Sequence, residues 1–288
     1  MKKTTLALAL TLVTYGTTTW AAEEEEPVML ERPLWELGFG AGGLVQPHYP
    51  GASERQTRGL ALPYMVYRGD ILRIGDGQSA RAVAAENSFY ELSLSFDAAF
   101  DADSEGNDLR RGMPDLDFIF QVGPQLRFNL ASREFTDTSR GELQFSLQAR
   151  GAFSTDFGRI DHRGYVLEPM LRYRHYGLFD PRLELMVSLR PMWATRDLHA
   201  YFYDVKPEYT TATRDAYRSD SGYFGTGLHF YGTWHVNEKA RIFMGLQTNW
   251  HHGASNTRSP LFEDKQTVGF GIGFIWAVLE SRRTVMRP

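Results

Sequence analysis

The sequence predicts an all-β protein, an antiparallel transmembrane β-barrel of about 12 strands, and three observations support this prediction. Segment after segment alternates apolar and polar residues with a period of two, as a strand with two unlike faces does. These segments run about ten residues or more, close to the length of a tilted membrane-crossing strand and longer than most soluble strands. The N-terminus has the layout of a secretory signal, so the barrel is expected in the outer membrane of a Gram-negative bacterium.

The signal is read from the first residues. Lys2 and Lys3 precede an apolar stretch at residues 6–13, and Thr19 and Ala21 supply small residues at alternate positions. Cleavage is therefore expected after residue 21 or 22, followed by secretion to the periplasm. A retained membrane anchor is the alternative, but the apolar core is short for one. We divide the chain into a signal peptide at 1–21, an acidic N-terminal segment at 22–33 and a barrel at 34–288.

The composition excludes several classes of protein. The chain has no cysteine, which excludes a lipoprotein anchor and a disulfide framework. Hydrophobic residues make up 42% and aromatics 14%, yet no long apolar run follows the signal, so helical membrane spans are not expected. The formal net charge of -4 gives no reason to expect nucleic acid as a partner.

The clearest alternation lies at residues 118–130, where Phe118, Phe120 and Val122 share one face. Gln121 and Arg127 lie on the other face. Similar patterns fill 90–98, 142–150 and 183–190. A barrel needs its apolar face toward lipid and accepts polar side chains in a hydrated lumen. A soluble β-sandwich would show the same alternation with the faces reversed, but strand length and the signal favour the barrel.

Twelve candidate strands follow from this pattern, an even number as closure requires. They are expected near 34–45, 58–67, 71–84, 88–100, 116–130, 141–153, 164–176, 182–194, 199–205, 222–236, 239–252 and 266–278. The third and ninth are weak, so counts of 10–14 stay open. If the first strand rises from the periplasm, the long loops at 206–221 and 253–265 lie outside, whereas 101–114 falls on the periplasmic side.

Inward-facing charges bear on whether the lumen conducts. Five arginines are expected to face five acids there: Arg127, Arg150, Arg172, Arg174 and Arg190 against Glu91, Asp97, Glu142, Glu168 and Glu184. Balanced charges favour a cross-linked, plugged interior. A pore or solute channel in the outer membrane is the second hypothesis.

A lipid-modifying hydrolase is a distant third hypothesis. In an extended strand His252 and Ser255 point to opposite faces, and His251 lies roughly 13 Å from Ser255, unless a turn at Gly253 brings them together. His229 and His235 are too far apart along one strand to chelate a metal by themselves. The acidic run at 101–108 lacks the calcium-loop pattern. No catalytic, cofactor-binding or metal-binding residue is assigned, and the protein is not expected to be an enzyme.

The stretch from 110 to 117 carries a resemblance to a known family. Its residues are Arg110, Arg111, Gly112, Met113, Pro114, Asp115, Leu116 and Asp117, followed by Gly123-Pro124-Gln125-Leu126. The sequence resembles the family of MltA-interacting proteins, also called MipA/OmpV. Supporting matches are 49–52 (YPGA), 63–70 (PYMVYRGD), 201–205 (YFYDV) and 214–217, which leads into Gly222-Tyr223.

The resemblance implies an outer-membrane protein. It further implies a scaffold that brings a membrane-bound lytic murein transglycosylase together with a penicillin-binding protein in peptidoglycan growth. We predict that the motif (Arg110, Arg111, Gly112, Met113, Pro114, Asp115 and Asp117) faces the partner on the periplasmic side. The alternative is that it caps the lumen and starts the next strand. One departure from the pattern of such barrels is the tail at 278–288, which follows Phe274-Ile275-Trp276. Because of this tail, the sequence does not identify the strand that closes the barrel.

Overall fold

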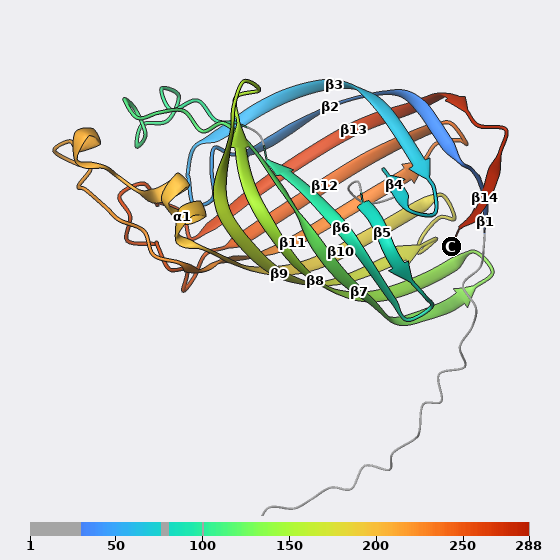
Figure 1. Ribbon diagram of the computed structural model, residues 1–288. Coiled ribbons are helices and arrows are strands. Elements are labelled where there is room, and N and C mark those ends of the chain that lie inside the picture. The colour runs from blue at the N-terminus through green and yellow to red at the C-terminus, as the bar shows by residue number, and fades with distance from the viewer. Residues whose placement is uncertain (1–29, 76–80, 100, 288) are drawn as a thin grey trace, which may run out of the picture.

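The computed structural model describes residues 30–75, 81–99 and 101–287, and within them the chain forms a closed antiparallel barrel of twelve strands (Figure 1). The predicted signal peptide and most of the acidic segment lie outside the described residues. Around the barrel the order is β10-β11-β12-β13-β2-β3-β4-β5-β6-β7-β8-β9. The strands are β2 (Trp35–Pro47), β3 (Arg55–Arg68), β4 (Leu72–Ile74), β5 (Arg81–Glu86), β6 (Tyr90–Ala99), β7 (Phe118–Thr136), β8 (Ser139–Thr155), β9 (Ile160–Tyr176), β10 (Leu183–Ala194), β11 (Gly222–His235), β12 (Ala240–Trp250) and β13 (Gln266–Glu280).

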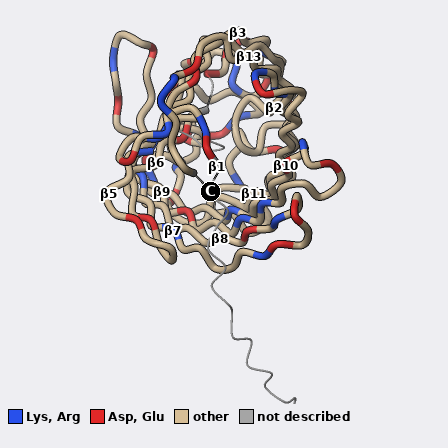
Figure 2. Tube along the Cα trace, turned by 90° about the vertical axis from the view of Figure 1, so that its right-hand side faces the viewer, with Lys and Arg blue, Asp and Glu red and all other residues tan. Residues whose placement is uncertain are grey.

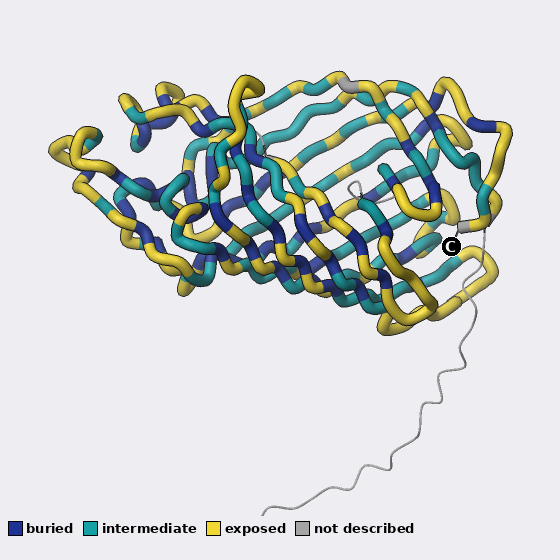
Figure 3. Tube along the Cα trace, in the orientation of Figure 1, coloured by how far each residue is buried: buried dark blue, intermediate teal, exposed yellow. Residues whose placement is uncertain are grey.

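Apolar side chains point outward along these strands and polar ones point inward. On β7, Val122 and Leu130 are exposed while Gln125 and Arg127 are buried. Figure 3 shows this alternation of buried and exposed residues along the other strands. An exposed apolar band of this extent suits a lipid-facing surface, since water-facing surfaces rarely carry one. The prediction of a transmembrane barrel is thus confirmed.

Ten of the expected strands each match one strand of the barrel, and the other two predictions are wrong in detail. The segment at 71–84 contains two short strands, β4 and β5, because Gly75 with φ +69° ends β4 in a conformation that suits glycine. The segment at 199–205 is not a strand, since α1 (Arg196–Tyr203) occupies most of it. The count of twelve is right because these two errors cancel.

A small second sheet joins the two ends of the described chain. β1 (Leu30–Pro33) pairs antiparallel with β14 (Thr284–Arg287), next to the seam where β13 pairs with β2 (Figure 1). Thr284 Oγ1 donates to Glu31 Oε1 at 2.6 Å across this ribbon. The strand that closes the barrel is therefore β13, and the tail after it forms the ribbon with β1.

The connections divide between the two ends of the barrel. The longest, at 101–117, 195–221 and 251–265, share one end with 48–54 and 156–159, which we call the loop end. Short turns at 87–89, 137–138, 177–182 and 236–239 lie at the other end with the β1–β14 ribbon, which we call the terminal end. The prediction that 101–114 lies opposite the other two long loops is wrong, because the extra strand within 71–86 reverses the chain direction before that segment.

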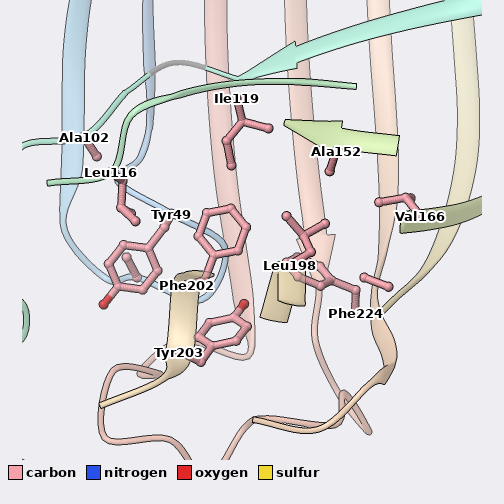
Figure 4. Packing of buried hydrophobic residues seen from close by; sticks show 12 residues of the cluster. Tyr49, Ala102, Leu116, Ile119, Ala152, Val166, Leu198, Phe202, Tyr203 and Phe224 are labelled. Carbon is pink, nitrogen blue, oxygen red and sulfur yellow. The ribbon is translucent and has the colours of Figure 1, made fainter. Parts of the chain in front are cut away.

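Among the described residues, helical structure is confined to one loop. α1 and the short 3-10 helix η1 (Pro207–Tyr209) both lie between β10 and β11. No helix of the described residues is long and apolar enough to cross a membrane. The buried apolar cluster lies at the loop end of the barrel, against α1 (Figure 4).

Candidate functional site

The mouth of the barrel at the loop end is filled by α1. Its buried side chains are Leu198, His199, Phe202 and Tyr203, a spacing that places them on one helical face. This face packs against inward-facing residues of the barrel rim and of the neighbouring loops, as Figure 4 shows: Tyr49, Ala102, Leu116, Ile119, Ala152, Val166 and Phe224. The helix thus closes the mouth by apolar packing.

Hydrogen bonds tie four loops into one unit over this helix, which we call the cap (residues 48–54, 101–117, 195–221 and 251–265). The Tyr203 hydroxyl donates to the carbonyl of Pro50 at 2.8 Å. The Tyr49 hydroxyl donates to the carbonyl of Leu261 at 2.7 Å. Ser259 Oγ donates to the carbonyl of Tyr203 at 2.8 Å. Because each bond joins two different loops, the cap holds together as a unit.

The family motif is part of this cap. Arg110 is only 4% exposed and donates to the carbonyl oxygens of Phe202 at 3.2 Å and Pro114 at 3.0 Å. From the other direction, Arg214 donates to the carbonyl of Leu109 at 2.6 Å. The buried Arg110 side chain therefore fastens the 101–117 loop to α1. Arg111 and Gly112 are exposed, and a partner-facing role for them stays a prediction.

The rest of the motif lines an open groove of about 700 Å³ at the loop end. Met113, Pro114, Asp115 and Asp117 lie on one side of it, and α1 and the start of β9 supply the other side. The Asp115 carboxylate also accepts from the backbone amide of Ser104 at 2.8 Å, which fixes the turn of the loop.

Burial in the cap shifts the pKa of several side chains. It raises the pKa of Tyr201 to about 12 and raises that of Tyr203 well above its ordinary value. Burial lowers the pKa of His199, and it lowers that of His251 as well. His199 and His251 flank the Phe224 ring, so two neutral imidazoles complete the apolar core of the cap.

A cavity of about 360 Å³ lies directly beneath the cap. Its roof is apolar and includes Leu198, Phe202 and Phe224. Its walls and floor are polar and come from eight strands, β6 to β13: Asp97, Gln121, Arg150, Glu168, Arg190, Thr226, His229, Tyr231, Gln247, Asn249 and Thr267. The lumen is therefore lined by polar side chains below an apolar lid.

Ion pairs narrow the lumen below this cavity. Arg190 lies 2.8 Å from Asp97 and 2.7 Å from Glu168. Arg150 lies 3.2 Å from Glu168 and 3.7 Å from the same Asp97 oxygen. These four side chains, the girdle, come from β6, β8, β9 and β10. The two pairs of Asp97 link strands that are not neighbours, whereas the two pairs of Glu168 link adjacent strands. Such pairs cross-link the wall and occupy the lumen.

Further ion pairs lie toward the terminal end. The Glu36 carboxylate forms ion pairs with Arg68 at 2.6 Å and with Arg241 at 2.6 Å, and Arg174 pairs with Glu184 at 3.2 Å. Figure 2, a view onto the end that carries the C-terminus, shows basic and acidic residues interspersed around the barrel. The predicted cross-linking of lumen arginines to acids is confirmed for Arg127, Arg150, Arg174 and Arg190. Arg172 differs, because its guanidinium donates to Met170 Sδ and makes no ion pair with a described residue.

The residues considered for a hydrolase serve the cap. His251 Nδ1 lies 3.0 Å from the carbonyl of Phe224, and the Ser255 amide donates to the carbonyl of Tyr223. A Ser–His hydrogen bond does occur near the terminal end, where Ser139 Oγ lies 2.9 Å from His175 Nε2. The other ring nitrogen faces the Tyr173 hydroxyl at 2.7 Å, a phenol where a hydrolase triad has a carboxylate.

Within the described ranges, no three His, Cys, Asp or Glu side chains gather closely enough to hold a metal ion.

A family model described as "MltA-interacting protein MipA" matches residues 39–278, most of the chain. The chain belongs to the MipA family. The matched span runs from β2 to β13, so family membership covers the barrel as well as the cap. Together with the barrel fold, it supports location in the outer membrane. A search of the curated proteins found no match.

Solved structures similar to this MipA-family chain are outer-membrane barrels. The NanC porin is 11% identical with a TM-score of 0.40, over 83% of this chain and all of the porin. The toluene transporter TodX of Pseudomonas putida is 8% identical with a TM-score of 0.29, over 83% of this chain and 88% of TodX. A loop-deletion mutant of OmpT from Vibrio cholerae is 12% identical with a TM-score of 0.26, over 84% and 99%.

Proposed function

We propose that this protein is a closed outer-membrane barrel that acts as a scaffold, holding a lytic murein transglycosylase beside a penicillin-binding protein during peptidoglycan growth. The observation that carries the proposal is the double closure of the lumen, by the cap at the mouth and by the girdle below it. A barrel closed in this way is suited to binding partners at its rim rather than to passing solutes. The family description supports a transglycosylase as one partner.

The proposal includes an orientation in the membrane. Bacterial single-chain barrels keep both termini and their short turns in the periplasm and extend their longer loops outside. The terminal end has the β1–β14 ribbon and the short turns, so we assign it to the periplasm. The cap, with its 110–117 motif, then faces outward. The surface for periplasmic partners is accordingly proposed at the terminal end.

An exposed apolar turn makes the terminal end testable. Phe179 is 82% exposed and Leu178 is 45% exposed, both in the turn between β9 and β10. A Leu178→Ser, Phe179→Ser double variant is expected to reduce capture of the transglycosylase at least about tenfold, as loss of an apolar hot spot does. The matched control is Arg111→Ser, Met113→Ser in the cap, which is expected to capture as well as wild type. Equal capture by wild type and the Leu178→Ser, Phe179→Ser variant would contradict this surface.

A narrow solute channel is the second candidate, and a specific observation favours it. Asp97, Arg150 and Arg190 line both the cavity beneath the cap and a second cavity further down, so the two spaces adjoin at the girdle. Planar-bilayer recordings of the refolded barrel separate the two functions. The scaffold predicts silent bilayers, and steady single-channel steps would favour the channel. The family and the fold together favour a non-enzymatic protein in either case.

A further inference from the structure

The second cavity in the lumen has a volume of about 180 Å³ and lies on the terminal side of the girdle. Seven strands, β5 to β11, contribute to its wall. Its polar lining consists of Arg81, Ser95, Asp97, Gln125, Gln148, Arg150, Arg172, Ser188, Arg190 and Tyr231. We call this space the chamber. Four of these side chains are arginines and one is a carboxylate, so positive charge predominates at its wall.

Nearby carboxylates are shared among several arginines. Asp97 and Glu168 both serve Arg150 and Arg190 in the girdle. Glu91 serves three arginines, with Arg81 at 3.4 Å, Arg127 at 3.3 Å and Arg73 at 3.4 Å. The acids around the chamber are therefore already engaged.

Arg172 is the side chain that this sharing leaves without an acid. Its Nε and Nη1 atoms are buried and have no hydrogen-bond partner among the described residues, and its Nη2 donates to the sulfur of Met170 at 3.6 Å, a weak acceptor. The charged groups that act on it most strongly are those of Arg174, Arg127, Arg190 and Arg81, all of its own sign. A buried guanidinium in such surroundings is destabilised unless an anion accompanies it.

The neighbours of Arg172 are suited to an anion. In the register of the sheet, Ser188 of β10 lies opposite Arg172, and Ser146 of β8 lies one step along the same wall. Ser146 Oγ is also buried without a hydrogen-bond partner. Ser95, Gln125, Gln148 and Tyr231 add further hydroxyl and amide donors to the chamber wall.

We propose that the chamber is a binding site for a small oxyanion, of the carboxylate or phosphate class, held by Arg172. The anion accepts hydrogen bonds from the guanidinium nitrogens that lack protein acceptors and balances the positive charge of the surrounding arginines. Arginine suits this role because its charge persists at all physiological pH values and its donors match planar oxyanions. This site goes beyond the scaffold function and does not depend on it.

The test is calorimetric titration of the folded barrel in detergent with inorganic phosphate, and in a second arm with acetate, against chloride at equal ionic strength. Wild type is expected to bind one anion per barrel. Tighter binding of phosphate or of acetate shows which class of oxyanion the site prefers. Arg172→Gln is expected to weaken binding at least about tenfold, since a charged hydrogen-bond partner is lost. The matched control Arg159→Gln removes an exposed arginine of the loop end and is expected to bind as wild type does.

Absence of oxyanion binding in wild type would overturn the proposal, as would equal binding by Arg172→Gln. Folding of Arg172→Gln is checked by whether its electrophoretic mobility changes on heating. If it does not fold, Arg172→Lys replaces it in the test, because lysine keeps the charge and removes the planar donors. This variant is expected to bind more weakly than wild type, and equal affinity would also overturn the proposal. Transglycosylase capture by the same variants is expected to be unchanged, so failure of the anion site and failure of the scaffold give different results.

Discussion

The cap and the girdle close the same lumen by opposite physical means. The cap uses an apolar cluster around Phe202 and Phe224, with hydrogen bonds between loops at its edges. The girdle uses ion pairs among Asp97, Glu168 and Arg190 in a polar interior. Apolar packing on loops opens locally, whereas ion pairs between strands open only if the wall itself deforms. The cap is therefore the closure that can move, and the girdle is the one that stays with the barrel.

The largest expected effect comes from breaking the girdle. Glu168→Ala removes the carboxylate 2.7 Å from Arg190 and 3.2 Å from Arg150 and leaves both arginines to share Asp97. Loss of one partner from a buried pair should lower the free energy of unfolding by about 3–5 kcal/mol. Urea unfolding of the refolded barrel measures it, with Glu238→Ala in an exposed turn as the control. A loss no larger than the control's would show that the girdle does not stabilise the wall.

A smaller effect is expected in the cap. Phe202→Ala removes an aromatic ring from the apolar cluster and should lower the free energy of opening the cap by about 3 kcal/mol. The loss should be local, so hydrogen exchange in α1 accelerates while the urea midpoint of the barrel stays unchanged. Phe157→Ala serves as the control, because that ring is 87% exposed at the same end. A shift of the global midpoint as large as that of Glu168→Ala would contradict a locally opening cap.

A single hydrogen bond between cap loops should have a smaller effect again. Tyr203→Phe removes the hydroxyl that donates to the carbonyl of Pro50 at 2.8 Å. It should lower the free energy of local opening of these two loops by about 1 kcal/mol. Amide exchange in residues 48–54 is the measurement. Unchanged protection there would mean that this bond does not hold the two loops together.

The smallest expected effect is a pH dependence of the cap. The pKa values of His199 and His251 are lowered by burial, so the opened cap binds protons more readily than the closed one. The closed cap is therefore favoured at neutral pH and loses stability as pH falls below the ordinary histidine value of about 6.5. Proteolysis of residues 195–221 should accelerate between about pH 7.5 and about pH 5.5.

The control for this dependence is the neighbouring His252, which is exposed. His252→Gln should retain the acid sensitivity, whereas a His199→Gln, His251→Gln double variant should lose it. The reverse pattern would assign the effect to the surface rather than to the core of the cap.

Most of the wall could be predicted from the sequence, because each strand carries its own period-two pattern. That pattern places the side chains of Arg190 and Glu168 in the lumen, where they form an ion pair. The cap could not be predicted, because the sequence predicts a weak strand at 199–205, where most residues lie in α1. A helical signal was nevertheless present, since Leu198, His199, Phe202 and Tyr203 repeat at helical spacing. The chamber could not be predicted for another reason. The alternation shows which arginines face the lumen but gives no distances between them and the acids. That Arg172 lacks an acidic partner is therefore visible only in the structure.

The β1–β14 ribbon has a consequence for how the chain can be connected. Leu30 lies opposite Arg287, so the two ends of the described chain are adjacent. A short linker could therefore join them, and new ends could be opened in the exposed turn at 177–182. Circular permutation generally succeeds where termini are adjacent and the new break falls in such a turn. The order in which these strands enter the membrane is thus separable from the barrel that they form.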